Sequence, residues 1–323
     1  MRVLVTGATG FIGLEVARRL ADAGRLPRLM VRRVSRAPLV ASLDAEVVHG
    51  DLRSRPSLRR ALAGIDAVIH LAGRATFEPY AKLAPTLVDG TRTLMEEAIH
   101  AGVSNVAFGS SALVYRGDGE IIDESTRVDP HIDYGRAKVD AEEVLAELGA
   151  AAGVSVGSLR LPHVYGPHSL LFGMIRNRVV PFPGSGTNHF AHMHVADAAD
   201  ALIAAVERPP NTPIPVADHG SFTWNEFFEI LGSYAPGVRV LRLPRALSQL
   251  GARVVGRPLG SLGPTMISPD TIRSWNQDIR IDPGAGWRGL GIEPRFSTLL
   301  EGIPATLDDV VAFRWRHPVW DRT

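Results

Sequence analysis

The chain has 323 residues, enough for one large domain or two modest ones. Its formal net charge of +1 gives no electrostatic reason to expect nucleic acid or an anionic membrane as a partner. It contains no cysteine, which excludes disulfides, thiolate catalysis and cysteine-ligated metals, and we expect a reducing cytoplasm as its compartment. We expect neither a cleavable signal peptide nor a membrane span, because no apolar run approaches the ~20 residues that a spanning helix needs.

Short β-branched segments alternate with amphipathic segments in the first half of the chain. This alternation predicts a parallel sheet covered by helices on both faces, the doubly wound α/β (Rossmann) fold that binds nucleotides. The predicted strands cover residues 3–5, 28–31, 46–49, 67–70, 105–108 and 156–161, and the predicted helices cover 12–23, 56–63, 80–100 and 134–148.

The pattern changes after Tyr165, where Gly and Pro residues interrupt it. A helical run at 196–206 and a strand-like run at 214–216 resume the earlier style, and short helices with Pro- and Gly-rich connections follow. We expect the aromatic and basic tail, residues 313–320, to pack against the body of the protein. A dinucleotide-binding domain is predicted over 1–166 with 191–217 returning to it, and a smaller, mostly helical substrate-binding lobe over 167–190 and 218–323.

A glycine triplet, Gly7, Gly10 and Gly13, follows the first predicted strand and opens the first predicted helix. Glycine is needed where the turn is tight and where backbone approaches a pyrophosphate, whose charge the free N–H groups and the positive end of the helix dipole then hold. A merely structural Gly-rich turn is the alternative, but the flanking strand and helix are those that a phosphate cradle requires. The residues predicted to contact the dinucleotide here are Thr6, Gly7, Thr9, Gly10, Phe11, Ile12 and Gly13.

The second predicted strand ends in Arg32 and Arg33, with Arg36 just beyond, and no acidic residue occurs between Asp22 and Asp44. Enzymes that use NAD usually place Asp or Glu at this strand end, where the carboxylate binds the ribose hydroxyls. Guanidinium groups instead match the 2′-phosphate of NADP. We therefore predict that NADP(H) is preferred and that NAD(H) is possible, with solvated surface arginines as the alternative reading.

Tyr134 and Lys138 form a Y-x-x-x-K pattern on a predicted helix, so that both side chains lie on one face. A free tyrosine has a pKa of about 10, and a neighbouring ammonium favours the phenolate and lowers that pKa. The pair therefore suits proton transfer, and Lys138 can also hold ribose hydroxyls. A surface Tyr and Lys on an amphipathic helix remain the alternative.

Taken together, these motifs resemble the extended short-chain dehydrogenase/reductases, the NAD-dependent epimerase/dehydratase family. Residues 6–13, T-G-A-T-G-F-I-G, are similar to its fingerprint, and the pattern around 184–195 is closest to the 3β-hydroxysteroid dehydrogenase and dihydroflavonol reductase branch. The resemblance covers residues 1–217 closely and the remainder loosely. Further matches in chain order are Gly50-Asp51-Leu52, His70-Leu71-Ala72-Gly73, Gly90-Thr91, Arg160 to Pro167 (R-x-x-N-V-Y-G-P, with His163 in place of Asn) and His194-Val195-Ala196-Asp197.

This resemblance implies the remaining roles in the site. Ser111, in a segment similar to the family's S-S-x-x-V-Y, is implied to be the third catalytic residue beside Tyr134 and Lys138, although a serine that ties its own turn is the local alternative. His163 is implied to lie next to the nicotinamide and substrate, and a substrate contact and a packed histidine both remain open. The further cofactor contacts that the resemblance implies are Asp51, Leu52, Leu71, Ala72, Gly73, Leu161, His163 and Val164.

Several residues differ from the family's motifs, and these differences narrow the range of expected reactions. Ala112 and Leu113 stand where sugar 4,6-dehydratases carry an Asp-Glu pair, which argues against dehydration. Phe190 occupies the slot where nucleotide-sugar enzymes often have a diphosphate-binding arginine. We therefore expect an oxidoreductase that interconverts a ketone or aldehyde and an alcohol on a fairly apolar, steroid-, flavonoid- or terpenoid-like molecule, with Ser111, His163 and Phe190 contacting it. The alternatives are a nucleotide-sugar epimerase or reductase with the same Ser/Tyr/Lys site, and a non-catalytic NAD(P)-sensing regulator.

His189, His192 and His194 lie close together, and a metal site was therefore considered. No acidic residue lies within the run, and His194 is already part of the H-V-x-D element, so we expect no metal. The expected partner is a small-molecule substrate, without nucleic acid. The resemblance also implies a homodimer that forms through the predicted helices at 80–100 and 134–148.

Overall fold

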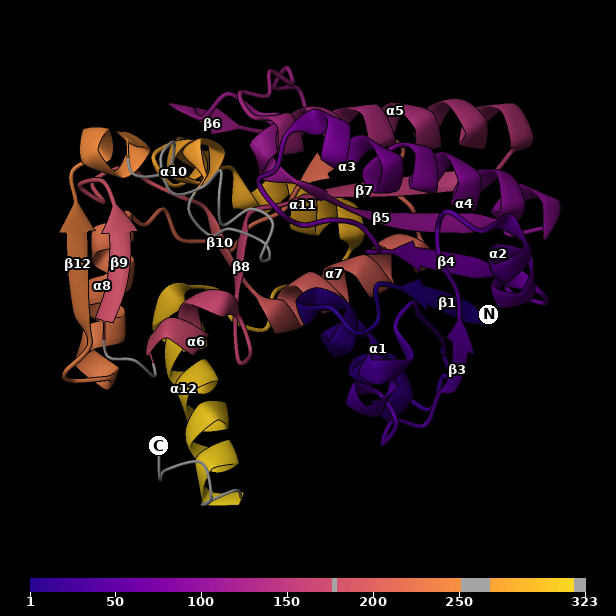
Figure 1. Ribbon diagram of the computed structural model, residues 1–323, viewed down its shortest axis with the longest axis horizontal. Coiled ribbons are helices and arrows are strands. Elements are labelled where there is room, and N and C mark those ends of the chain that lie inside the picture. Colours follow the sequence, from indigo (N-terminus) through magenta and orange to yellow (C-terminus); the bar gives the residue numbers. More distant parts are fainter. Residues whose placement is uncertain (176–178, 251–267, 317–323) are drawn as a thin grey trace.

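The computed structural model describes residues 1–175, 179–250 and 268–316. A seven-stranded sheet, in which every neighbouring pair is parallel, has the order β11-β7-β5-β4-β1-β2-β3 (Figure 1). The chain runs in opposite directions across the sheet from β1, which is the switch point at which doubly wound folds bind ligands. The predicted fold class is confirmed. The strands are β1 (Val3–Thr6), β2 (Arg28–Val31), β3 (Glu46–His49), β4 (Ala67–His70), β5 (Asn105–Ser111), β7 (Ser155–Leu161) and β11 (Ile214–Pro215).

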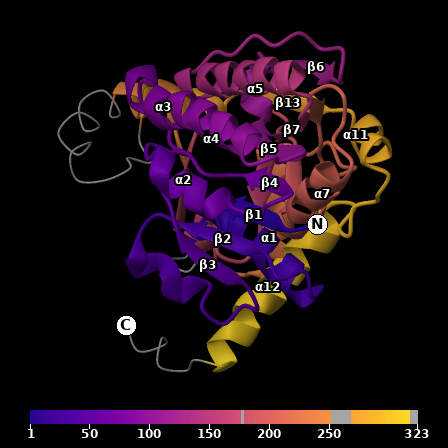
Figure 2. The ribbon, with the colours of Figure 1, turned by 90° about the vertical axis from the view of Figure 1, so that its right-hand side faces the viewer.

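Helices cover both faces of this sheet (Figure 2). Because side chains alternate along a strand, Val3 and Val5 of β1 enter one apolar cluster and Leu4 enters another. The first cluster is completed by α1 (Phe11–Asp22), α7 (Val195–Glu207) and α11 (Pro283–Leu290), and the second by α2 (Arg55–Leu62), α4 (Asp89–His100) and α5 (Asp133–Ala152). No described helix has the length and apolar character that crossing a bilayer requires.

The prediction of one continuous helix over 80–100 was wrong, because the helix breaks at Val88 into α3 (Tyr80–Leu87) and α4. The Thr91 hydroxyl donates to the Leu87 carbonyl at 2.7 Å, a side-chain bond that competes with the helix ladder. Helices α3, α4 and α5 pack against one another on one face. The homodimer expected through these helices stays a prediction.

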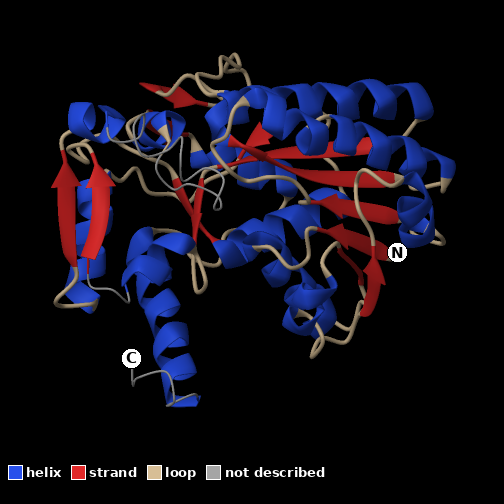
Figure 3. Ribbon diagram, in the orientation of Figure 1, coloured by secondary structure: helices blue, strands red, loops and turns tan. Residues whose placement is uncertain are grey.

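A second lobe gathers at one end of the sheet around a core rich in aromatic side chains, among them Phe182, Trp224 and Phe227 (Figure 3). The pair β6–β13 joins the two predicted domains, whose boundaries stay a prediction. The side chains of the aromatic and basic tail lie outside the described residues. The remaining elements are η1 (Val34–Leu39), η2 (Ala112–Val114), β6 (Asp118–Ile122), β8 (His163–Tyr165), α6 (Leu170–Ile175), β9 (Val179–Pro183), β10 (His192–His194), α8 (Trp224–Tyr234), β12 (Arg239–Leu243), α10 (Pro269–Trp275), β13 (Asp278–Ile281) and α12 (Leu299–Arg316).

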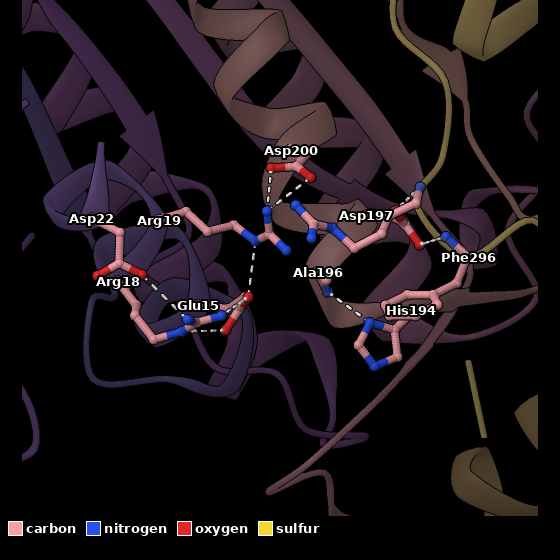
Figure 4. A network of polar contacts seen from close by, with 10 residues as sticks. Glu15, Arg18, Arg19, Asp22, His194, Ala196, Asp197, Asp200 and Phe296 are labelled. Carbon is pink, nitrogen blue, oxygen red and sulfur yellow. Dashed lines mark hydrogen bonds and ion pairs between the residues drawn. The ribbon is translucent and has the colours of Figure 1, made fainter. Parts of the chain in front are cut away.

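The H-V-x-D element ties the C-terminal region to the sheet (Figure 4). His194 caps α7, since its Nδ1 accepts from the Ala196 N–H at 3.1 Å. One turn later, the buried Asp197 carboxylate accepts from the backbone N–H groups of Arg295, at 2.5 Å, and Phe296, at 3.2 Å. The segment that leads into α12 is therefore attached directly to a helix of the nucleotide-binding domain.

A buried ion pair attaches α5 to the sheet. The Arg160 guanidinium on β7 donates from Nη2 to Glu142 Oε2 at 2.7 Å, and its Nη1 donates to the Tyr115 hydroxyl at 2.9 Å. The Ser110 hydroxyl also donates to Glu142. Glu142 is 6% exposed and Arg160 is 8% exposed, so each charge depends on the other for compensation.

We expect Glu142→Gln to lower the free energy of unfolding by about 3–5 kcal/mol, because a buried guanidinium loses its counter-charge. Equilibrium urea unfolding measures this loss. The matched control is Glu143→Gln, an exposed neighbour on the same helix, for which a change within about 0.5 kcal/mol is expected. Equal stabilities for the two variants would contradict the role assigned to the pair.

Candidate active site

A cleft of about 780 Å³ lies at the carboxyl ends of the sheet strands and extends to the second lobe. It brings together residues from both halves of the chain. Of the predicted cofactor and substrate residues, Thr6 alone is absent from its lining. The predicted residues that line the cleft are Gly7, Thr9, Gly10, Phe11, Ile12, Gly13, Arg32, Arg33, Asp51, Leu52, Leu71, Ala72, Gly73, Ser111, Tyr134, Lys138, Leu161, His163, Val164 and Phe190.

The glycine turn forms one end of the cleft, and its close packing requires glycine. Gly7 has φ +72°, and a Cβ there would lie 2.7 Å from the Leu71 carbonyl carbon. A Cβ on Gly13 would lie 2.2 Å from the Gly7 oxygen. No side chain caps α1 and its first turn holds no acidic residue, so its backbone N–H groups can bind an anion. These residues fit the pyrophosphate of a dinucleotide.

Thr6 lies behind the cleft and supports it. Its hydroxyl is 2.8 Å from His70 Nδ1 and accepts from the N–H groups of Leu71 and Ala72. His70 Nε2 is 2.9 Å from the Thr91 hydroxyl, whose own proton goes to a backbone carbonyl. His70 must therefore donate from Nε2 and accept from Thr6 at Nδ1, and burial keeps it neutral by lowering its pKa to about 3. Thr6 positions the strand end that faces the cofactor.

The part of the cleft beside the end of β2, where the resemblance places the adenosine of a dinucleotide, is basic. Arg32, Arg33 and Arg36 line it, their side chains are exposed, and within the described parts of the chain none of them forms an ion pair. Asp51 also lines this end and accepts from the Arg53 backbone N–H at 2.9 Å. Burial opposes the Asp51 charge, but its bonds to Arg53 hold the pKa of the carboxyl below the usual value.

Tyr134 and Lys138 lie in the first turns of α5, where both line the cleft. Lys138 Nζ donates to the Gly109 carbonyl at 2.6 Å and lies 5.8 Å from the centre of the Tyr134 ring. Burial lowers the pKa of Lys138 to about 8, against the opposing charge of Glu142. Burial also raises the pKa of Tyr134 to about 12, so the expectation that the neighbouring ammonium lowers this pKa was wrong for the protein by itself. The phenol is therefore protonated at neutral pH, the state required of a proton donor.

Ser111 ends β5 on the wall of the same cleft. Its Oγ accepts from the Leu113 N–H at 3.2 Å and thereby caps η2. The local turn that the sequence left as an alternative is thus present. The bond uses an oxygen lone pair of Ser111, and the hydroxyl proton stays free to donate to a ligand.

His163 lines the cleft in front of a fully buried histidine. His163 Nδ1 and His192 Nδ1 are 3.1 Å apart, so one of them carries a proton and the other accepts it. Burial lowers the pKa of His163 to about 4, and burial together with the nearby His163 lowers the pKa of His192 well below its usual value. The pair is neutral at physiological pH, and Nε2 is the nitrogen of His163 left to meet a ligand.

Aromatic side chains of the second lobe close one end of the cleft, which we call its aromatic end. Trp224 and Trp275 stack at 5.0 Å between ring centres, and Phe190 lies 5.3 Å from Trp224. The described residues that line this end include no lysine or arginine. Sequence reasoning missed both tryptophans; the one signal present was the T-x-x-E capping box, Thr223 to Glu226, which places Trp224 at the start of a helix.

The three neighbouring histidines have separate partners. His192 pairs with His163, His194 contacts Ala196 and Thr306, and His189 lies 3.8 Å from Asp278. Among the described residues, no group of three or more His, Asp or Glu side chains has the arrangement of a metal site.

Comparison with known proteins identifies relatives that include a reductase and an epimerase. The chain is 31% identical over 253 residues to the ceramide reductase of Caulobacter vibrioides, covering 75% of this chain and 73% of that one. It is 30% identical over 251 residues to a UDP-glucose 4-epimerase of Neisseria meningitidis serogroup C, covering 65% and 74%. The solved structure of MoeE5 in complex with UDP-glucuronic acid and NAD has a TM-score of 0.76 and 26% identity, covering 97% and 99%.

The family assignment follows from the motifs, the fold and the cleft together with these relatives. The model of the NAD dependent epimerase/dehydratase family matches residues 3–217, which include the glycine turn, Ser111, Tyr134 and Lys138. The chain belongs to the NAD-dependent epimerase/dehydratase family and is an NAD(P)-dependent enzyme of the extended short-chain dehydrogenase/reductase type.

Proposed function

We propose that the protein is an NADP(H)-dependent oxidoreductase that interconverts a ketone or aldehyde and an alcohol on a fairly apolar small molecule. The observation that carries this proposal is the division of the cleft. Tyr134, Lys138 and Ser111 lie along it, whereas Phe190, Trp224 and other apolar side chains close its aromatic end, the proposed substrate end, where the described lining contains no Lys or Arg. Such a surface favours an apolar ligand and gives a diphosphate no counter-charge. The likeness to a ceramide reductase supports a reductive role.

Each polar residue has a distinct task in this proposal. When bound, the reduced nicotinamide supplies the hydride. The Ser111 hydroxyl donates a hydrogen bond to the carbonyl oxygen, and Tyr134 transfers its phenolic proton to the same oxygen. Lys138 holds the ribose hydroxyls, and its ammonium stabilises the phenolate that remains on Tyr134. Oxidation of the alcohol to the ketone uses the same groups in reverse.

A nucleotide-sugar epimerase remains the second candidate, because the same three residues would serve it. The likeness to a UDP-glucose 4-epimerase and to MoeE5, whose structure holds UDP-glucuronic acid, favours this alternative. The apolar character of the substrate end argues against it. A non-catalytic regulator is disfavoured, since both Tyr134 and Lys138 are present and face the cleft.

Tyr134→Phe should reduce kcat by about 10²- to 10⁴-fold, because it removes the proton donor and nothing else. Absorbance of the reduced nicotinamide, followed with a carbonyl substrate found by screening, measures the rate. Fluorescence titration should show unchanged cofactor affinity. Tyr234→Phe, on an exposed tyrosine, is the matched control and should be fully active. Near-normal turnover of Tyr134→Phe would remove this residue from the mechanism.

A nucleoside diphosphate sugar should not raise the melting temperature of the cofactor-loaded protein, since a ligand that binds the native state must stabilise it. Differential scanning fluorimetry with UDP-glucose and UDP-glucuronic acid makes this measurement, and a bound cofactor that does raise the melting temperature is the positive control. A clear dose-dependent shift with either sugar would overturn the apolar-substrate proposal in favour of the epimerase.

The preference for NADP(H) is proposed from the basic adenosine end. Arg32, Arg33 and Arg36 reach the cleft without forming an ion pair with a described residue, although the Arg32 charge acts on Asp51. The Glu46 side chain of the next strand is engaged by Arg2 and Arg28. A 2′-phosphate placed beside β2 would therefore meet guanidinium groups that it can bind through two parallel hydrogen bonds.

NADPH should bind the wild type at least about tenfold more tightly than NADH, equivalent to about 1.4 kcal/mol. Arg32→Ala should remove most of this difference by weakening NADPH alone. Fluorescence or calorimetric titrations of both cofactors measure it, and Arg60→Ala, an exposed arginine on α2, is the matched control. Equal affinities of the wild type for both cofactors would refute the preference.

A further inference from the structure

The two-stranded pair β9–β12 has one covered face and one open face. Paired residues of neighbouring strands point to the same side, and Val180 and Phe182 of β9 are buried against the second lobe. The opposite side carries Val179, paired with Arg239, and Leu241, paired with Pro181. Val179 is 45% exposed and Leu241 is 54% exposed. Figures 1 and 3 show the pair at one end of the molecule, with α8 along one side.

Further exposed apolar residues follow immediately after β12. Leu243, at the end of the strand, is 38% exposed. Residues 245–250 are helical, and Leu247 and Leu250, one turn apart on one side of that helix, are 64% and 60% exposed. A soluble surface rarely exposes so many large aliphatic side chains in one stretch, and contiguous apolar patches mark interaction sites.

Arginines are interleaved with these leucines. Arg239 and Arg245 are exposed, and neither forms an ion pair with another described residue. Arg242, which pairs with Phe182, belongs to the other side of the strand pair. The sequence contains no Asp or Glu between Glu229 and Asp270. The net charge of the whole chain, +1, therefore conceals a local surface that is both apolar and positive.

We propose that this apolar–basic face, made of Val179, Leu241, Leu243, Leu247 and Leu250 with Arg239 and Arg245, docks on the surface of an anionic lipid bilayer. Aliphatic side chains enter the boundary between headgroups and acyl chains, and arginines at the rim bind anionic headgroups. A second copy of the chain fits less well, because it would bring the same unpaired arginines together. Nucleic acid would leave the leucines exposed.

The apolar–basic face lies close to the aromatic end of the cleft. Phe182, on the covered side of β9, lies 5.6 Å from Trp224 and 5.3 Å from Trp275 between ring centres, and both tryptophans line the cleft. Docking therefore places the aromatic end of the cleft one layer of side chains from the bilayer. Docking does not depend on the proposed function. Any benefit of docking for an apolar substrate does depend on that function.

The test is co-flotation of the full-length protein with vesicles of phosphatidylcholine alone or of phosphatidylcholine mixed with phosphatidylglycerol. We expect binding to the anionic vesicles, weaker binding to the neutral ones, and loss at high salt. Leu241→Gln with Leu247→Gln, and separately Arg239→Gln with Arg245→Gln, should each lower the partition coefficient on the order of tenfold. Ile121→Gln, a 70% exposed apolar residue on β6, is the matched control and should bind as the wild type does.

Each variant is also checked by its melting temperature and by NADPH binding, neither of which should change. The proposal is overturned if the wild type fails to float with anionic vesicles, or if the leucine variant floats as well as the wild type. Conversion of a dimer to a monomer by the leucine variant, without vesicle binding by the wild type, would instead identify the face as a contact between copies. Vesicle binding requires no turnover, so a failure of the proposed reaction leaves this test unaffected.

Discussion

The site depends on the buried ion pair between Glu142 and Arg160. Helix α5 carries both Tyr134 and Lys138, and this pair fixes the helix to β7 from within the protein. Glu142 also lies one turn beyond Lys138, so the carboxylate that balances Arg160 supports the lysine ammonium as well. One carboxylate thus serves both the packing and the electrostatics of the site. A neutral residue in place of Glu142 would keep the shape of the helix but leave two buried cations, Arg160 and Lys138, without compensation.

The cleft combines two environments that have different requirements. Its cofactor end depends on backbone geometry, since the turn at Gly7 and the contact of Gly13 leave no room for a side chain. Its substrate end depends on packed aromatic side chains such as Trp224 and Trp275. The cofactor end therefore suits one family of cofactors. The shape of the substrate end, in contrast, varies with the amino acids that the lobe contributes. This division is consistent with relatives that share the fold and act on different substrates.

The sequence predicted the parts of the protein that are encoded locally. The glycine turn and the pair Tyr134 and Lys138 are defined by short spacings, and these residues do line one cleft. Features that depend on distant partners escaped prediction. The stacking of Trp224 on Trp275 joins segments far apart in the chain, and the pattern of apolar residues gives no sign of the break at Val88. The net charge also could not reveal that positive charge gathers in one part of the second lobe, because a sum of charges over the chain contains no information on their positions.

The attachment of residues 295–296 to Asp197 has a consequence for motion. The chain leaves the sheet after β11 and is attached again when β13 pairs with β6, α11 packs into the first apolar cluster, and residues 295–296 bind Asp197 of α7. The part of the lobe between β11 and β13 is therefore a loop fastened at both ends. A lobe joined by a single linker can swing as a rigid body, whereas a loop clamped at both ends can only flex between its anchors. Substrate would then enter by bending of the lobe. This bending widens the entrance of the cleft, while the sheet and helices around the cofactor keep their positions.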